Sequence, residues 1–325
     1  MPPRLARLLA AVVAIALVAG AFALRGTLSD DDDTTSSGPG RSGDDGEGYR
    51  VLCDEDLGEA ACAAVAEATG ADVDVMTGGE VLAAYTADGA APDWDLWLTL
   101  DPLPGVLDTA RTEFEKGPVT RTIAAVASGP LALLTRADDL PDGCDDVATW
   151  DCLTEPVNPA IAVPSDDTAL GIVAVAAGAT GLHGNTDFDI NDYRGTAEAA
   201  ALDSLLNDSP SAAGSTTADQ TQALLRPGAT SAAVTIDGLA TAVAGTVQGQ
   251  GRDLVVRDLA PEVVVGVVAV GLGDAGDDAL AALREALTDQ TVRAALADGG
   301  WTGDPTRTSG LPKPDLVYAL QEELG

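Results

Sequence analysis

The chain has 325 residues, of which 52 are acidic and 17 are basic, so its formal net charge is −35. This charge argues against a nucleic-acid-binding protein, because binding to phosphates requires a positively charged surface. Aromatic residues make up only 3% of the sequence, so a core must be built from closely packed Ala, Val and Leu side chains.

The first segment is typical of export. Arg4 and Arg7 precede an apolar run over residues 8–24, and Ala-Phe-Ala at 21–23 has the small residues that a signal peptidase needs. As a helix this run would extend about 26 Å, which also allows an uncleaved anchor, the alternative that we favour. We predict a signal peptide or signal anchor over 1–25 and an extracytoplasmic protein that is anchored in the cell membrane or secreted.

Residues 26–48 follow with a different composition. They are rich in Asp, Ser, Thr and Gly and contain almost no apolar side chain. Such a segment cannot bury enough apolar surface to offset the entropy of ordering it. We therefore predict a disordered acidic linker over 26–48.

From residue 49 onwards, short β-rich runs alternate with helical stretches, as in the βαβ units of an α/β fold. Strands are expected at 49–53, 71–76, 95–100, 119–126, 131–135, 160–163, 231–236, 253–256 and 263–270. Helices are expected at 57–69, 79–87, 169–179, 196–206, 217–225, 277–287, 290–297 and 315–324, with a short one that Asp237 caps. Ser128-Gly129-Pro130 separates two β-rich runs and indicates a crossing between lobes.

The four cysteines form two close pairs along the chain. Neither pair has the Cys-x2-4-Cys spacing that is typical of a zinc site. Outside the cytoplasm disulfides persist, and partners that are near in the sequence meet easily. We predict the disulfides Cys53–Cys62 and Cys144–Cys152.

Four stretches, taken in chain order, resemble those of a known family. They are the opening strand and helix at 49–69, Pro-Asp-Trp-Asp-Leu-Trp-Leu at 92–98, the Trp-containing segment at 149–153 followed by Ile-Ala-Val-Pro-Ser at 161–165, and an alanine-rich helix ending in Asp-Gly-Gly-Trp at 294–301. Together they resemble the type II periplasmic or extracellular solute-binding proteins of ABC-type transporters, including the molybdate-like and iron-like branches.

The resemblance implies an α/β fold of two lobes joined by hinge-crossing strands. Lobe I would comprise 49–126 and 237–325, and lobe II would comprise 127–236. It further implies that a small-molecule solute binds in the cleft, that the lobes close over it by a hinge motion, and that an ABC-type membrane permease is a partner. We expect a monomer that needs no cofactor.

In open α/β sheets, ligands gather beyond the carboxyl ends of the strands, where helix N-termini offer free N–H groups. This geometry selects six candidate ligand-binding residues: Ser128, Ser165, Asp166, Thr168, Asp54 and Thr235. The acids in these loops, which also include Glu55, Asp167 and Asp237, would repel an oxyanion. Either the solute is cationic, zwitterionic or neutral, or the acids only cap helices and the binding function is altered.

A calcium loop is a further possibility. Asp187, Asp189, Asn191 and Glu198 fall at its positions 1, 3, 5 and 12. Asp192 replaces the glycine that the turn needs, so an Asp/Asn-rich loop that caps the next helix is the interpretation that we favour. We predict no resident metal ion.

Motifs of enzymes are missing from the sequence. His183 is the single histidine and lies in a Gly-rich stretch, and Gly-x-Ser-x-Gly, His-Glu-x-x-His and phosphate-loop sequences do not occur. We therefore predict a binding protein and not an enzyme. The alternative to a solute receptor is a membrane-anchored cell-envelope interaction module with a degenerate binding-protein fold.

Overall fold

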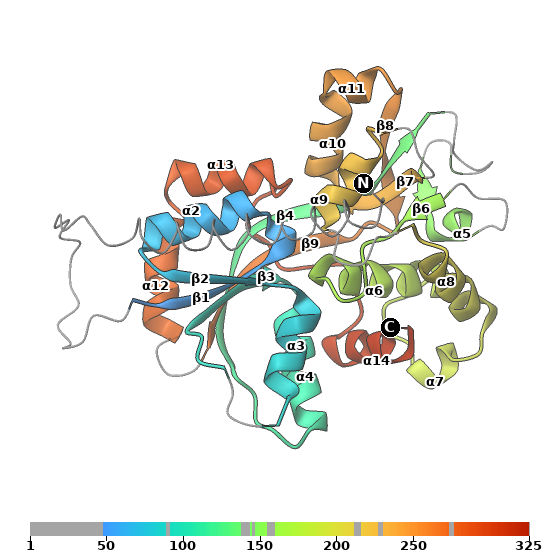
Figure 1. Cartoon of the computed structure of the whole chain (residues 1–325). Coiled ribbons are helices and arrows are strands. Elements are labelled where there is room, and N and C mark those ends of the chain that lie inside the picture. Colours follow the sequence, from blue (N-terminus) through green and yellow to red (C-terminus); the bar gives the residue numbers. More distant parts are fainter. Residues whose placement is uncertain are drawn as a thin grey trace, which may run out of the picture. The chain divides into compact units, whose positions relative to one another are not determined.

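One long strand, β4 (Thr120–Arg136), belongs to two sheets in the computed structural model (Figure 1). Its first half pairs antiparallel with β9 (Val264–Leu272), and its second half pairs with β7 (Thr230–Ile236) and β8 (Leu254–Ala260). The two strands expected at 119–126 and 131–135 are therefore one. The Ser-Gly-Pro sequence between them lies where this strand passes from one lobe to the other, which confirms the predicted crossing.

The structure describes residues 48–88, 92–137, 144, 147–154, 160–210, 216–226, 230–272 and 276–324. The predicted leader at 1–25 and the linker at 26–48, apart from Gly48, lie outside the described residues. Residues 48–325 form one unit in which the lobes are in direct contact. In the part of the chain that is described, no helix is both long enough and apolar enough to cross a bilayer.

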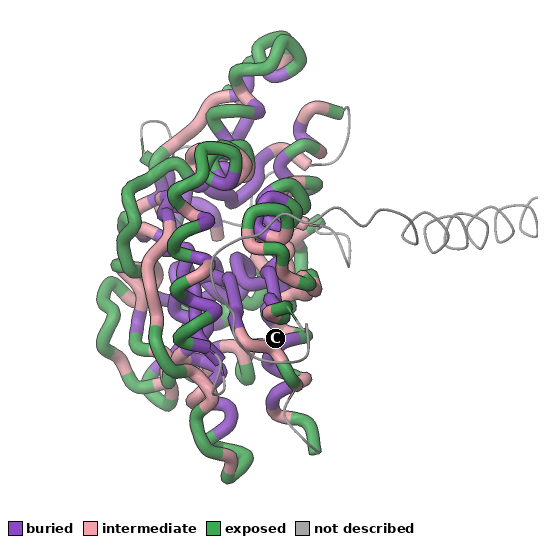
Figure 2. The backbone as a smooth tube through the Cα atoms, turned by 90° about the vertical axis from the view of Figure 1, so that its left-hand side faces the viewer, coloured by how far each residue is buried: buried purple, intermediate pink, exposed green. Residues whose placement is uncertain are grey.

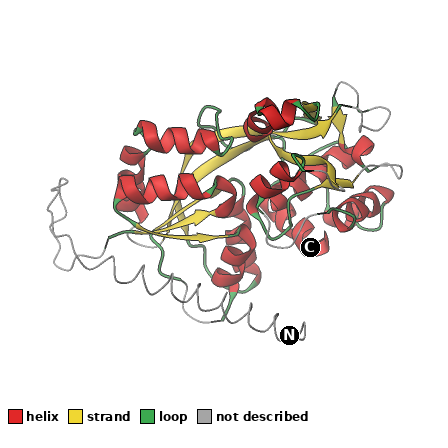
Figure 3. Cartoon of the chain, turned by 45° about the horizontal axis from the view of Figure 1, so that its top comes forward, coloured by secondary structure: helices red, strands yellow, loops and turns green. Residues whose placement is uncertain are grey.

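The first lobe is built on a sheet with the order β2-β1-β3-β9-β4. Its parallel strands are β1 (Arg50–Asp54), β2 (Asp72–Met76) and β3 (Leu96–Leu100). All five residues of β3 are buried, as its apolar run predicts. One face of the sheet carries α2 (Glu59–Thr69), α12 (Gly276–Ala286) and α13 (Gln290–Asp298), and the other carries α3 (Gly78–Thr86) and α4 (Leu103–Glu113) (Figures 1 and 3).

The helix α4 was not expected from the sequence. Its first turn contains Pro104 and Gly105, which are ordinarily signals of a turn. Proline is tolerated in the first turn of a helix, because the N–H groups there have no partner within the helix.

The second lobe surrounds β4, β7, β8 and two short strands, β5 (Ala148–Thr149) and β6 (Ala160–Ala162). Its central helix is α6 (Ala169–His183), in which every residue from Ala169 to Thr180 is buried. A helix without a polar face lies in the interior, and the buried stretches in Figure 2 run through the middle of the fold. Around these elements lie α5 (Trp150–Leu153), α7 (Ile190–Tyr193), α8 (Ala197–Asn207), α9 (Thr217–Ala223), α10 (Asp237–Gly245) and α11 (Val247–Gln250).

The sheet pairing corrects the expected boundary between the lobes. The sequence pattern placed all of 237–325 in lobe I, whereas β8 pairs with residues 132–136 of β4, in the sheet of the second lobe. β8 therefore lies with the sheet of lobe II. The pattern could not show this, because strand partners are set by the fold and not by the sequence of one strand.

Both predicted disulfides are present in the structure. Disulfides link Cys53 with Cys62 and Cys144 with Cys152. The first joins the end of β1 to the first half of α2 and so fixes the loop 54–58 between them. This loop leads into the site described below.

A segment that we call the hinge strap, residues 301–310, lies along the two places where the chain passes between the lobes, at Ser128 in β4 and at Val264 at the start of β9. The Ser128 hydroxyl donates to the Asp304 carbonyl at 2.8 Å, and the Ser309 N–H donates to the Val264 carbonyl at 3.0 Å. Arg307 donates to both carboxylate oxygens of Asp101, at 2.9 and 2.7 Å. The last helix, α14 (Pro314–Leu324), packs against α4 of the first lobe and α6 of the second.

A substitution at Gly171, in the first turn of α6, tests how closely the loop 164–168 approaches this helix. A Cβ atom at Gly171 would lie 1.7 Å from the carbonyl oxygen of Ser165. Gly171→Ala is therefore expected to lower the free energy of unfolding by about 3 kcal/mol, measured by urea denaturation. The control is Gly245→Ala at the end of α10, where a Cβ meets nothing within 4 Å. We expect this variant to be neutral or more stable by up to about 1 kcal/mol, and equal losses in both variants would contradict the packing described.

Candidate functional site

Three consecutive acidic residues lie at the carboxyl end of β1: Asp54 is the last residue of the strand, and Glu55 and Asp56 begin the loop after it. This loop forms a short 3-10 helix, η1 (Glu55–Leu57), which Asp54 caps. The buried Asp54 carboxylate accepts the Asp56 N–H at 3.2 Å and the Thr99 hydroxyl at 3.0 Å. Asp54 is therefore held entirely within the first lobe.

Asp56, in contrast to Asp54, accepts hydrogen bonds from the second lobe. One carboxylate oxygen accepts the Leu170 N–H at 2.6 Å, in the first turn of α6. The other accepts the Thr217 hydroxyl at 2.7 Å, at the first residue of α9. A single carboxylate of the first lobe thus joins the beginnings of two helices of the second.

A second polar contact joins the lobes beside Asp56. The Gly79 N–H at the start of α3 donates to the Asp167 carbonyl at 2.7 Å. A Cβ atom at Gly79 would lie 2.8 Å from that oxygen, and one at Gly78 would lie 3.0 Å from the Cα atom of Ala169 in α6. The two glycines allow the backbones of the lobes to meet directly.

Next to this contact, a cavity of about 280 Å³ remains between the lobes. The first lobe contributes Glu55, Asp56, Glu59 and Trp301 to its wall, and the second contributes Leu170, Thr217, Asp219, Ile236 and Leu239. Among the described residues that line it there are four carboxylates and neither Lys nor Arg. The cavity therefore combines carboxylates with apolar side chains, and both lobes contribute to each kind.

Burial raises the pKa of three carboxylates in this region, and neighbouring charges add to the rise for Asp54 and Glu55. Burial raises the pKa of Asp54 well above its ordinary value, and the Asp56 charge adds to the rise. Burial also raises the pKa of Asp56, against the lowering by the Leu170 N–H and the Thr217 hydroxyl. The pKa of Glu55 is raised by burial and then by the charges of Asp56, Asp167, Glu80 and Asp219. A positive charge in the cavity would relieve this repulsion.

Of the six predicted ligand-binding residues, the structure places Thr168 at the contact between the lobes, whereas Asp54 lies within the first lobe. Thr168 caps α6, where its hydroxyl accepts the Gly171 N–H at 3.0 Å and donates to the Ser165 carbonyl at 2.9 Å. Thr235 is fully buried behind α9, where it accepts the Thr221 hydroxyl at 2.9 Å. Ser128 lies at the hinge and is engaged by the strap.

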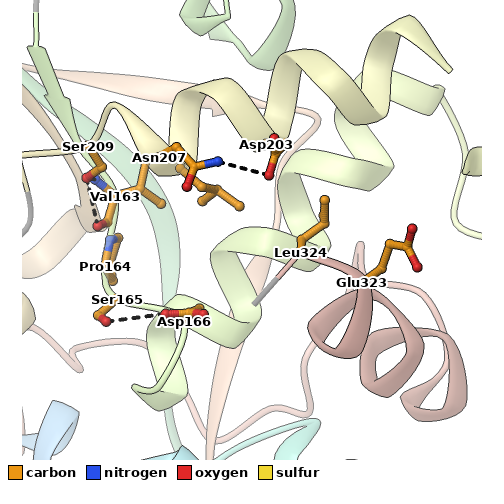
Figure 4. Close-up of a pocket in the computed structure, with 10 residues that line it drawn as sticks. Val163, Pro164, Ser165, Asp166, Asp203, Asn207, Ser209, Glu323 and Leu324 are labelled. Atoms are coloured by element: carbon orange, nitrogen blue, oxygen red, sulfur yellow. Dashed lines mark hydrogen bonds between the residues drawn. The ribbon is translucent and has the colours of Figure 1, made fainter. Parts of the chain in front are cut away.

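Ser165 and Asp166 line a different cavity, of about 460 Å³, which Figure 4 shows. Its other walls come from α8, through Asp203 and Asn207, and from the end of α14, through Glu323 and Leu324. The Ser165 hydroxyl is 3.5 Å from an Asp166 carboxylate oxygen. The six residues therefore do not converge on one cavity.

Asp56 is the residue that the sequence analysis missed. The neighbouring Asp54 and Glu55 were noticed as acids that follow a strand, and capping is the ordinary role of such acids. The available signal was the run of three acids directly after a buried strand. One of them caps η1, so the others are free to point elsewhere.

Part of the suggested calcium loop makes local hydrogen bonds. Asp189 caps α7 by accepting the Asn191 N–H at 2.8 Å, and Asn185 accepts the Asp187 N–H at 2.9 Å. Within the described ranges, no group of three His, Cys, Asp or Glu side chains could hold a metal ion, so Asp187, Asp189 and Glu198 form no such group. The capping interpretation fits this geometry.

Comparison with known proteins finds similarity in structure alone. No family model matches the sequence, and no curated protein matches it. Among solved structures, the ferric binding protein from Campylobacter jejuni aligns with a TM-score of 0.56 at 12% identity, over 85% of this chain and 99% of that chain. Apo ferric ion-binding protein A from Pasteurella haemolytica gives 0.54 at 12%, over 85% and 95%.

A third similar structure is the periplasmic binding protein AfuA from Actinobacillus pleuropneumoniae, solved with fructose-6-phosphate bound. It gives a TM-score of 0.54 at 14% identity, over 81% of this chain and 86% of that chain. The chain thus has the two-lobed fold of the type II periplasmic solute-binding proteins. The resemblance seen in the sequence is confirmed at the level of the fold.

The buried Asp54 gives a prediction about pH. Because its pKa is raised in the folded protein, the folded state binds more protons than the unfolded chain from about pH 3.9 up to that raised value. The stability that Asp54 contributes is therefore present at low pH and is lost as the pH rises through the raised pKa. Asp54→Asn, which keeps an acceptor for the Asp56 N–H, is expected to be more stable than the wild type at pH 7.

Urea denaturation between pH 4 and 8 measures this difference. We expect the advantage of Asp54→Asn over the wild type to grow with pH and then level off. Asp258→Asn, at an exposed position of β8, is the control and should show a small difference that does not change with pH. A constant difference for Asp54→Asn would show that its carboxylate is not the titrating group.

Proposed function

We propose that the protein is an extracytoplasmic solute-binding protein that holds a cationic small molecule in the cavity between its lobes. The observation that supports this most directly is the wall of that cavity, which has four carboxylates from both lobes and no described basic residue. Its volume of about 280 Å³ is at the lower end of the range for ligand sites, about 300–1,000 Å³. The solute is therefore small.

The residues that line the cavity suggest the chemistry of the solute. The carboxylates would attract an ammonium group, which gains most where the site excludes water. The apolar part of the lining, with Leu170, Ile236, Leu239 and Trp301, would contact an apolar part of the solute, and an indole also attracts cations. A primary amine or quaternary ammonium compound with a short apolar body combines both features.

Export and delivery complete the proposal. The apolar segment behind Arg4 and Arg7 would direct the chain out of the cytoplasm, anchored in the membrane or released, and two disulfides suit an oxidising environment. The similar structures are named as periplasmic or ferric ion-binding proteins. By analogy with this fold, the solute would pass to an ABC-type permease, with the protein acting as a monomer and without catalysis.

One observation favours a second candidate. The carboxylate of Asp56 already occupies the start of α6, which is the place where a helix would bind an anionic solute. A protein that kept the fold but lost its solute would act as a cell-envelope interaction module, whose ligand is a polymer or another protein. Titration with small solutes separates the two candidates.

Isothermal titration calorimetry of the exported part of the chain against amines, quaternary ammonium compounds, zwitterions, neutral sugars and oxyanions tests the function. We expect saturable binding of a cationic compound, weakened by salt, and none of sulfate or phosphate. Glu59→Gln, which removes one charge from the wall, is expected to weaken binding about tenfold, or about 1.4 kcal/mol.

The matched control is Asp258→Asn, which removes a charge on the exposed side of β8. It should bind as the wild type does. Binding of an oxyanion in place of a cation would contradict the proposed solute class. The absence of binding heat for every compound of the panel would favour the interaction module.

A further inference from the structure

The contact made by Asp56 satisfies polar groups that α6 and α9 cannot satisfy alone. Leu170 is the second residue of α6, and the first N–H groups of a helix have no partner within it. The side chain of the capping residue Thr168 accepts the Gly171 N–H. The Leu170 N–H has its acceptor in the other lobe, the Asp56 carboxylate at 2.6 Å.

The environment makes this contact strong. The Leu170 residue is 1% exposed, and the positive end of the α6 dipole faces the carboxylate. Thr217 adds a second charge-assisted hydrogen bond at 2.7 Å from another helix. If the lobes separated, Asp56 would exchange these partners for water, and the start of α6 would lose its acceptor.

We propose that Asp56 is an internal ligand, a latch that holds the two lobes closed when no solute is bound. In binding proteins with a hinge, the solute ordinarily supplies the contacts that join the lobes. Here the chain supplies one itself, with a carboxylate at the start of a buried helix. The resting state is therefore closed, and solute exchange requires the release of Asp56.

The latch also has a consequence for selectivity. An oxyanion could reach the start of α6 only by displacing Asp56 from Leu170 and Thr217. Its charge would meet Glu55 and Asp167, two carboxylates that already repel each other: the pKa of Glu55 is raised by burial and also by the charge of Asp167. The latch thus excludes anionic solutes from the start of α6, whereas the cavity beside it can hold a cation.

The test compares solution shape and thermal stability without solute, so it does not depend on the proposed solute. Small-angle scattering of the wild type should match the closed form. Asp56→Ala should increase the radius of gyration and lower the Tm by about 5 °C. Sodium acetate, a free carboxylate, should restore both values in a saturable manner in Asp56→Ala and have little effect on the wild type.

Asp167→Ala is the matched control. Asp167 lies in the loop before α6 and joins the other lobe through its backbone carbonyl, so the loss of its exposed carboxylate should leave the scattering curve unchanged. An Asp56→Ala protein that stays closed, or that acetate does not restore, would overturn the proposal.

Thr217→Val and Thr217→Ser provide a test if Asp56→Ala fails to fold. Valine has the shape of threonine without the hydroxyl, so it should lower the Tm and shift the scattering towards the open form. Serine keeps the hydroxyl and should restore the closed form. Valine and serine variants that both scatter as the wild type does would refute the latch.

Discussion

The structure depends on how one carboxylate is satisfied. Asp56 is brought to the edge of the first sheet by β1 and by the disulfide that fixes the loop after it. There it accepts hydrogen bonds from the starts of α6 and α9. A charge that leaves water needs such partners, and the partners lie in the second lobe. The need to satisfy Asp56 therefore ties the arrangement of the lobes to the sequence of a single loop.

The contacts at the hinge also hold the lobes in this arrangement. The strap at 301–310 follows both crossings and is joined to the first lobe by the Arg307–Asp101 ion pair, so the lobes are held at the hinge and at Asp56. Between these two attachments lies the cavity with its carboxylate wall. In this cavity, carboxylates of the strongly acidic chain lie among apolar side chains.

Local signals in the sequence predicted most of the elements, and the fold followed from their order. The apolar run of β3, the caps of the helices and the close cysteine pairs depend on neighbouring residues, so they could be recognised directly. Partners that are distant in the sequence could not. The pairing of β8 with β4 and the contact of Asp56 with Leu170, 114 residues away, depend on the tertiary fold. Ser165 and Thr168 illustrate this limit: only two residues lie between them, yet Ser165 lines a cavity in the second lobe and Thr168 caps α6.

Amide hydrogen exchange at Leu170 in the solute-free protein tests the central claim most directly. This N–H lies in the first turn of α6 and donates to Asp56 of the other lobe, so its protection reports the closed state. The Gly171 N–H, which donates to Thr168 of the same lobe, serves as the internal reference. We predict that both amides are protected. Rapid exchange at Leu170 beside a protected Gly171 would show that the lobes are open at rest.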